Sequence, residues 1–244
     1  MRNFSQLYKD IVSGDDYWFE TALAIRVDSD HEYGTYSIVS ESDIFSISTS
    51  IEMFHGYPTI GSAVAQEIEV KMIYPTWFTI PLMAEIRPRI RVCNATQQSG
   101  WYSMGVFYVD TRERTVSDTG EKILVLHGYD AMLKAEQMYD GSLSGITGTS
   151  TDRQMVNSIA VQMGISVDNR TFNIMNRYYE IPLPTGYTCR EVLGYIASMY
   201  AGCFIINDVG QLRLVSLTEL PPETNLLITQ DGDLIQFGDD FILV

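Results

Sequence analysis

Apolar and polar residues alternate in several short segments between residues 17 and 127, and this alternation restricts what the chain can fold into. Leu23, Ile25 and Val27 are separated by smaller or polar residues, as a half-buried β-strand requires. Segments 68–72 and 86–92 repeat the pattern. Short strands with turn residues between them favour an antiparallel barrel or sandwich. The first half of the sequence therefore predicts an antiparallel β-domain.

Two of these segments carry opposite charges at every second position. The acidic pair is Glu67 and Glu69, and the basic set is Arg87, Arg89 and Arg91. We expect all five on the solvent face of one sheet, where cross-strand pairing would explain them. The residues between them that should face the core are Ile68, Val70, Ile86 and Ile90. Pro88 cannot donate to a ladder, so its strand is expected at a sheet edge or at a bulge.

The second half of the sequence carries helix signals. Asp130 can cap a helix that continues to about Tyr139. Thr151 and Thr188 each begin a capping box, and apolar residues follow both at helical spacing. Residues 204–207 and 212–217 resemble the two strands of a hairpin.

Together these patterns predict an α+β, β-rich fold: antiparallel β-barrel domains with a small α/β domain. The predicted division is an N-terminal β-barrel-like domain over residues 1–127, a small α/β domain over 128–207 and a β tail over 208–244, which would belong to a second barrel.

The net charge of −15 is concentrated at the two ends of the sequence. Residues 1–52 hold 10 acidic and 3 basic residues, residues 208–244 hold 7 and 1, and the middle holds 14 and 12. A strongly acidic protein repels phosphate backbones, so nucleic-acid binding is not expected. Solubility is the simplest explanation of the charge.

Motifs for catalysis and metal binding are missing from the sequence. Segment 141–145 has Leu143 where a G-x-S-x-G motif has its nucleophile, and segment 145–150 lacks the lysine of a phosphate-binding loop. Segment 28–32 resembles a calcium loop without its glycine and final glutamate. His127 is interpreted as a packing residue at a strand end. We predict no enzyme, no catalytic residue, no cofactor and no metal site.

The cysteines and apolar runs are equally uninformative about binding. Cys93, Cys189 and Cys203 are too few and too scattered for a disulfide framework or a zinc cluster, and we expect buried thiols. The apolar runs are too short to span a bilayer, which predicts no membrane association. The first residues lack the apolar stretch of a signal peptide.

The order and spacing of several segments resemble those of phage tail and baseplate hub proteins, from contractile tails, prophage tails and tail-like bacteriocins. The segments of the first half are Tyr57–Ser62, Glu67–Val70, Ile80–Pro81, Ile86–Val92 and Gly105–Asp110. Those that follow are Leu124–Met132, Thr188–Gly194 and Gly202–Asn207. Each segment alone is weakly specific, and the resemblance covers most of residues 17–217.

This resemblance implies a structural hub that joins the tail tube to a central spike or tip. It implies β-barrel domains with an inserted α/β domain, and a homotrimer around the tail axis. The protein would be made in the bacterial host cytoplasm and would end up in a virion tail or tail-like particle. DNA would pass through the ring without being bound.

If the acidic ends of the chain belong to the ring, they are expected to line this passage, because carboxylates repel the phosphate backbone near the wall. The candidate lining residues are Asp15, Asp16, Asp28, Asp30, Asp231, Asp233, Asp239 and Asp240.

Two other function classes stay open. A carbohydrate-binding tail module would also be β-rich and would expose aromatic residues; the sequence has 15 Tyr and 3 Trp. A cell-wall hydrolase needs only a pair of Asp or Glu residues beside a glycan groove, and no sequence spacing identifies such a pair.

Overall fold

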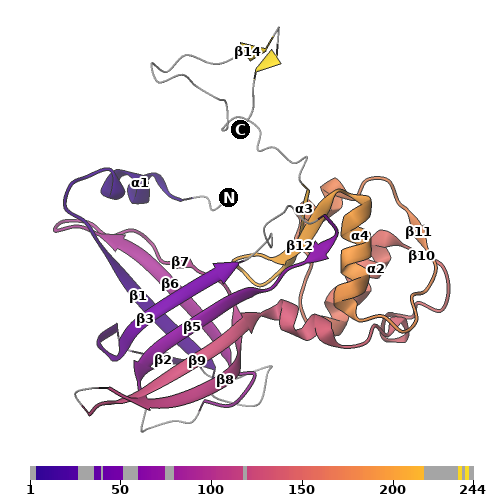
Figure 1. Ribbon diagram of the computed structural model, residues 1–244. Coiled ribbons are helices and arrows are strands. Elements are labelled where there is room, and N and C mark those ends of the chain that lie inside the picture. The colour runs from indigo at the N-terminus through magenta and orange to yellow at the C-terminus, as the bar shows by residue number, and fades with distance from the viewer. Residues whose placement is uncertain are drawn as a thin grey trace.

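The computed structural model describes residues 4–26, 36–39, 41–51, 60–74, 80–117, 120–216, 236–237 and 240–241. Figure 1 shows a large curled sheet and, beside it, a smaller unit of helices and short strands. No described helix has the length and apolar character needed to cross a membrane.

Within the described residues the large sheet contains eight strands, and all their pairings are antiparallel. Its strands are β1 (Trp18–Arg26), β2 (Tyr36–Val39), β3 (Ile44–Ile51), β5 (Gln66–Ile73), β6 (Glu85–Cys93), β7 (Tyr102–Ser103), β8 (Phe107–Val116) and β9 (Lys122–Asp130). The order is β2-β1-β6-β8-β9-β5-β3, and β7 pairs with β6. Helix α1 (Gln6–Val12) precedes the sheet, and the short helix η1 (Glu41–Asp43) joins β2 to β3.

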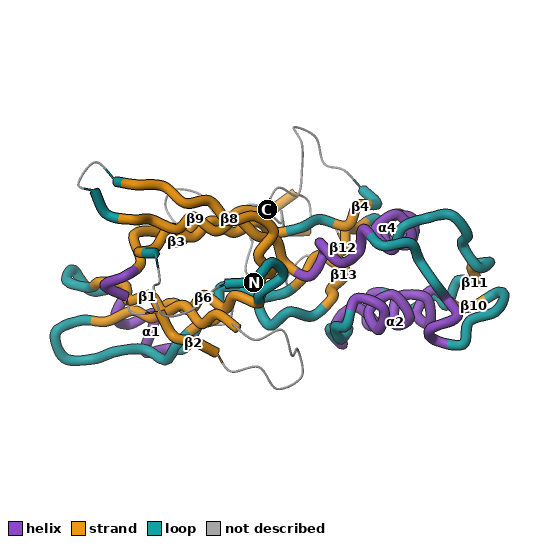
Figure 2. Tube along the Cα trace, turned by 90° about the horizontal axis from the view of Figure 1, so that it is seen from below, coloured by secondary structure: helices purple, strands orange, loops and turns teal. Residues whose placement is uncertain are grey.

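The sheet curls because its two end strands are consecutive in the sequence. Only residues 40–43 separate Val39 in β2 from Ile44 in β3, and such a link spans at most about 18 Å. One core fills the interior, where Leu23, Val70 and Phe107 are fully buried. Figure 2 shows the strands as two layers, with β3, β8 and β9 in one and β1, β2 and β6 in the other.

The prediction of a β-rich chain with a large antiparallel sheet is confirmed. Within the described residues no pairing joins β2 to β3, so the sheet is open between them. Closure into a barrel therefore stays a prediction.

Pro88 does not mark a sheet edge, because β6 lies between β1 and β8. Pro88 lies at a change of strand partner along one side of β6. β8 pairs with Glu85 and Ile86 of β6, whereas β7 pairs with β6 from Arg89 onward. The carbonyl of Pro88 accepts a hydrogen bond from the N–H of Met104 at 2.9 Å, on the β7 side. Since N and C=O of one strand residue point the same way, the missing N–H faces this break in pairing.

Strand β8 is longer than the sequence predicts. The sequence pattern predicts a hairpin of residues 101–110 and 121–126 around a polar stretch at 111–120, but β8 continues to Val116, beyond a register shift between Val109 and Thr111. Residues 110–116 are exposed, so they carry no apolar alternation that a sequence pattern would detect. Directly after β8, the N–H of Gly120 donates to the carbonyl of Ser117.

Among the described residues, the second unit contains five helices or short helical turns and several short strands. Its helical elements are η2 (Ala131–Glu136), η3 (Gly141–Ser144), α2 (Asp152–Met163), α3 (Asn169–Ile174) and α4 (Cys189–Met199). Its strands are β4 (Ser62–Ala63), β10 (Ser150–Thr151), β11 (Glu180–Ile181), β12 (Gly202–Ile206) and β13 (Leu212–Ser216). They form a three-stranded sheet, β13-β12-β4, and a pair, β10-β11; a separate pair is β14 (Gln236–Phe237) and β15 (Asp240–Phe241).

Both predicted capping boxes are present. The hydroxyl of Thr151 accepts from the N–H of Gln154, and that of Thr188 accepts from the N–H of Glu191. Asp130 also caps as predicted, but its helix η2 is a short 3-10 helix that ends at Glu136. It stops early because the following residues are extended and pair with residues 187–189.

One core holds the second unit together, with Met155, Leu193 and Phe204 fully buried in it. Val106 and Tyr108, at the start of β8, also belong to this core. Its members therefore come from beyond the predicted range 128–207. The predicted boundary at residue 207 falls inside the hairpin of β12 and β13, and Leu212 and Leu214 of β13 are buried in the same core.

Strand β4 also belongs to this unit, although it lies between β3 and β5 in the sequence. It pairs in parallel with β12, and two glycines allow it to lie directly on α4. A Cβ on Gly61, whose φ is +83°, would lie 1.8 Å from the hydroxyl oxygen of Ser198. A Cβ on Gly194 would lie 2.9 Å from the carbonyl oxygen of Gly61. Side chains at both positions are thus excluded by the contact itself.

Candidate functional site

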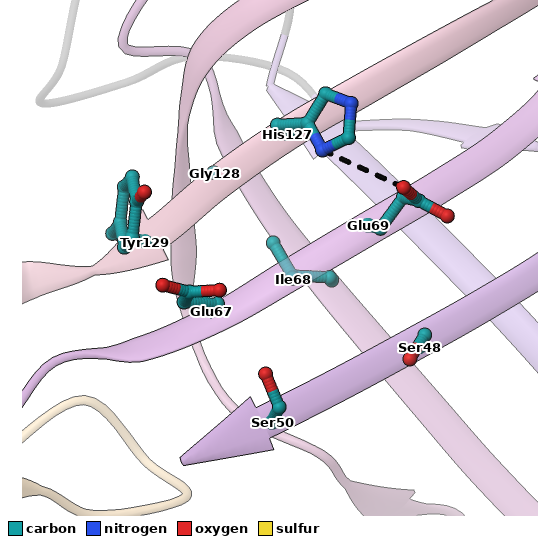
Figure 3. Close-up of a pocket in the computed structure, with 8 residues that line it drawn as sticks. All are labelled: Ser48, Ser50, Glu67, Ile68, Glu69, His127, Gly128 and Tyr129. Carbon is teal, nitrogen blue, oxygen red and sulfur yellow. Dashed lines mark ion pairs between the residues drawn. The ribbon is translucent and has the colours of Figure 1, made fainter. Parts of the chain in front are cut away.

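A polar hollow lies on the outer face of β3, β5 and β9 (Figure 3). Two rows of side chains cross the three strands: Ser48, Glu69 and His127 form one row, and Ser50, Glu67 and Tyr129 form the other. Between the rows, the aligned pair Ile68 and Gly128 belongs to the opposite face, where Ile68 is buried in the core. The hollow has a volume of ≈ 150 Å³.

The two glutamates of this hollow differ in whether a positive charge lies beside them. Glu69 is paired with Lys71 at 2.9 Å and lies 3.6 Å from Nδ1 of His127. The hydrogen bond from Lys71 lowers the pKa of Glu69, so this carboxyl is ionised at neutral pH. Glu67 is exposed and has no ion pair within the described part of the chain.

The hollow does not match the templates of hydrolytic catalysis. In a nucleophile relay the histidine lies between the acid and the hydroxyl, whereas Glu69 lies between Ser48 and His127. A glycosidase needs a carboxyl group of raised pKa as general acid. The pKa of Asp130 is raised to about 6 by burial, but its side chain lies on the opposite face of β9 from Tyr129 and bonds to backbone N–H groups. The hollow is suited to holding a polar or cationic group.

A second surface covers the outer face of β1 and β6, in the other layer of the curled sheet. We call it the arginine strip; its four arginines are Arg26, Arg87, Arg89 and Arg91. Arg26 and Arg87 both pair with Glu85, at 3.5 and 2.5 Å. Arg89 is exposed and makes no ion pair with any residue that the structure describes. Its cross-strand neighbours, Ala22 and Ser103, are too small to cover it.

Two exposed tryptophans end the arginine strip. Nε and Nη2 of Arg91 donate to Oε2 of Glu20 at 2.7 and 2.5 Å, and its guanidinium lies 4.5 Å from the ring centroid of Trp101. The indole N–H of Trp18 points to the same glutamate, 3.4 Å from Oε1. Trp18 and Trp101 are 49% and 40% exposed. The Glu20–Arg91 ion pair thus contacts both rings.

These two surfaces confirm one sequence prediction and correct its explanation. The glutamates of β5 and the arginines of β6 do lie on the outer face of one sheet, with Ile68, Val70 and Ile86 in the core. Ile90 is only half-buried. Cross-strand pairing between the two sets is wrong, because β8 and β9 separate β5 from β6. Each set finds its partners elsewhere, such as Lys71 and Glu20.

The predicted passage lining is described at few positions. Asp15 and Asp16 are exposed in the turn between α1 and β1. Asp28, Asp30, Asp231, Asp233 and Asp239 lie outside the described residues, as does the calcium-like segment 28–32. For Asp240 the structure describes only the backbone, in β15. Lining of a passage by these carboxylates stays a prediction.

Sequence reasoning did not select either surface as a site. The period-two charges gave the correct faces, but the two rows of the hollow depend on the pairing of β3 and β9 with β5, which no local pattern reveals. Among the described residues no group of His, Cys, Asp and Glu is arranged to hold a metal ion. The three cysteines are free and buried, as predicted.

No protein-family model and none of the curated proteins matches the sequence. Comparison with solved structures does find similar proteins. The 43 kDa tail protein of prophage MuSo2 from Shewanella oneidensis is similar over 87% of this chain, with 14% identity and a TM-score of 0.51. A tail protein from Neisseria meningitidis MC58 is similar over 80% of the chain, with 13% identity and a TM-score of 0.43. A chain of the Francisella PdpA-VgrG complex is similar over 83%, with 8% identity and a TM-score of 0.46.

The chain spans 58%, 50% and 29% of the lengths of these three proteins. The first similarity is high enough to compare folds, and it agrees with the resemblance found in the sequence motifs. The chain therefore has the fold of a prophage tail protein.

Proposed function

We propose that the chain is a structural hub subunit of a phage tail or tail-like particle. Three copies form a ring around the tail axis and join the tail tube to the central spike or tip. The observation that carries this proposal is the fold shared with the MuSo2 tail protein over 87% of the chain. The motif order of residues 17–217 supports it independently, because that order is a property of the sequence alone.

In this proposal the curled sheet closes into a barrel within the ring, where β2 and β3 lie at the two ends of the strand order. The protein is made in the host cytoplasm and acts in the assembled particle as a non-enzymatic part. DNA passes through the ring without being bound, past a wall to which the exposed Asp15 and Asp16 contribute. The geometry of the hollow supports a role without catalysis, since its Ser, Glu and His are in the wrong order for a relay.

The test is the mass of the protein in solution combined with electron microscopy of the particles it forms. A hub predicts three chains of 27.6 kDa and a ring with a central opening. A two-fold dimer as the sole oligomer would contradict the proposal, because a ring requires heterologous contacts that close by rotation.

A carbohydrate-binding tail module is the second candidate, and the exposed Trp18 and Trp101 are the observation that favours it. Against it, Arg91 occupies one face of Trp101, and Glu20 already accepts from Arg91 and Trp18. Little hydrogen-bonding capacity is left beside the rings for sugar hydroxyls. Binding of cell-wall glycans by a monomer, lost in Trp101→Ala, would favour this candidate; release of reducing ends would instead point to a hydrolase.

A further inference from the structure

The two outer faces of the curled sheet carry opposite charge. Among the described side chains that β1 and β6 contribute to the arginine strip, there are four arginines and two glutamates, Glu20 and Glu85, an excess of two positive charges. On the face of the hollow, β5 contributes Glu67 and Glu69 against Lys71, an excess of one negative charge. An excess of positive charge is unexpected on a chain whose net charge is −15. Such complementarity between two surfaces guides association and fixes the register of a contact.

The two faces also point away from each other. The strip lies on β1 and β6 and the hollow on β3, β5 and β9, which form different layers of the curled sheet around one core (Figure 2). Two different, complementary surfaces on one chain are what a heterologous contact between identical copies requires. A two-fold contact would instead place like charges together.

Each of the two faces has one charged side chain without an ion pair to any described residue, and these two side chains would lie at the centre of a contact between copies. Arg89 on the strip and Glu67 beside the hollow are both exposed, and neither has an ion pair among the described residues. Each stands between small or polar cross-strand neighbours: Ala22 and Ser103 beside Arg89, and Ser50 on one side of Glu67. A long guanidinium side chain can therefore enter the hollow without displacing an apolar residue.

Trp18 and Trp101 add apolar area at the end of the strip. Tryptophan and arginine are enriched among the residues that dominate the binding energy of protein interfaces. Here both rings are held by the Glu20–Arg91 pair, so little side-chain freedom is lost on docking.

From these observations we infer that the arginine strip of one copy docks on the face of the hollow of a second copy, with Arg89 of one chain opposite Glu67 of the next. This inference rests on the proposed ring and assigns the two surfaces by which it closes. Its occupant is a second copy of this chain because the same molecule carries both complementary faces.

Charge reversal on the full chain tests this contact. We expect Arg89→Glu and Glu67→Arg each to reduce the trimer to monomer, because each places like charges opposite one another. The double variant Arg89→Glu/Glu67→Arg restores the pair with its signs exchanged, and we expect it to recover the trimer. Arg177→Glu and Glu180→Arg, exposed charges of the second unit, are matched controls and should leave the mass unchanged.

Mass would be measured by light scattering after size exclusion, at low and high salt, with circular dichroism to verify folding. A wild-type trimer that persists in both single variants overturns the assigned contact but leaves the ring intact. Single variants that dissociate without recovery in the double variant show that Arg89 and Glu67 do not face each other. A wild-type monomer at all concentrations overturns the ring and the contact together.

Discussion

The carboxylate of Asp130 accepts a hydrogen bond from the backbone N–H of Gln66, with 2.9 Å between oxygen and nitrogen. Its second oxygen accepts from the N–H of Met132 at 2.9 Å, where helix η2 begins. One buried side chain thus joins the end of β9, the start of β5 and the first helix of the second unit. The two units are connected by polar chemistry as well as by the apolar core around Tyr108.

This buried carboxyl gives the free energy of unfolding a dependence on pH. Burial raises the pKa of Asp130 from 3.8 to about 6, so the folded state favours its neutral form. The contribution of this raised pKa to the free energy of unfolding is fully present below pH 3.8 and is lost as the pH rises through about 6. The change is about 3 kcal/mol, at 1.36 kcal/mol per pKa unit. Asp130→Asn stays neutral, so we expect the stability of wild type relative to this variant to fall by that amount between pH 4 and 7. Urea unfolding across this range measures it; a constant difference would contradict the prediction.

Asp168 should show the opposite dependence. Hydrogen bonds from Arg170, followed by those from its backbone and from Asn207, hold the pKa of Asp168 well below its usual range. Its stabilisation is present above about pH 4 and is lost as the pH falls further. Asp168 caps α3 and accepts a hydrogen bond from Asn207 at the end of β12. We therefore expect Asp168→Ala to lower the free energy of unfolding by about 2 kcal/mol at neutral pH. Arg170→Ala, whose side chain is half exposed, should cost less; equal losses would place the stabilisation in the ion pair alone.

Replacing Gly61 should disrupt the contact between β4 and α4. In Gly61→Ala the new Cβ meets Ser198 and the backbone of Gly194, and the left-handed φ adds about 1–2 kcal/mol of strain. We expect a clear fall in Tm. Gly148→Ala is the matched control, because no atom lies within 4 Å of its added Cβ. Similar Tm values for both variants would contradict the close approach.

The two units are expected to unfold together. All tryptophans precede residue 102, so their fluorescence reports the first half of the chain and none of the helices after residue 130. Leu193 is fully buried in the core of the second unit, and Leu193→Ala should cost about 2–5 kcal/mol. Because Tyr108, β4 and Asp130 connect the units, we expect this variant to lower the urea midpoint seen by tryptophan fluorescence. An unchanged fluorescence midpoint with a shifted circular dichroism midpoint would indicate independent domains, as the division at residue 127 predicts.

Some elements of the fold could be predicted from residues that are close together in the sequence. The capping boxes at Thr151 and Thr188 depend on residues three positions apart, and the faces of β5 depend on alternation within one strand, so both were predicted correctly. The extension of β8 to Val116 was missed because an exposed strand has no apolar period. The prediction that β5 and β6 pair with each other was also wrong, since strand order is decided by contacts between residues far apart in the sequence.

The candidate site was predictable only in its parts. Glu67 and Arg89 belong to alternating charge patterns that the sequence shows, but their positions on opposite sides of one core depend on the curl of the sheet. That curl follows from the short link between β2 and β3 at the two ends of the strand order, which no single segment encodes. The ordering of Trp101 by Arg91 likewise joins two segments whose relation appears only in three dimensions.

The placement of β4 has a consequence for how the protein is made. During synthesis Ser62 and Ala63 leave the ribosome long before their strand partners Cys203 and Phe204. The backbone groups of β12 that pair with β4, and the surface of α4 on which β4 lies, do not exist until that late stage. The nascent chain therefore carries β4 without its strand partner, and the core of the second unit cannot be completed until α4, β12 and β13 have all emerged.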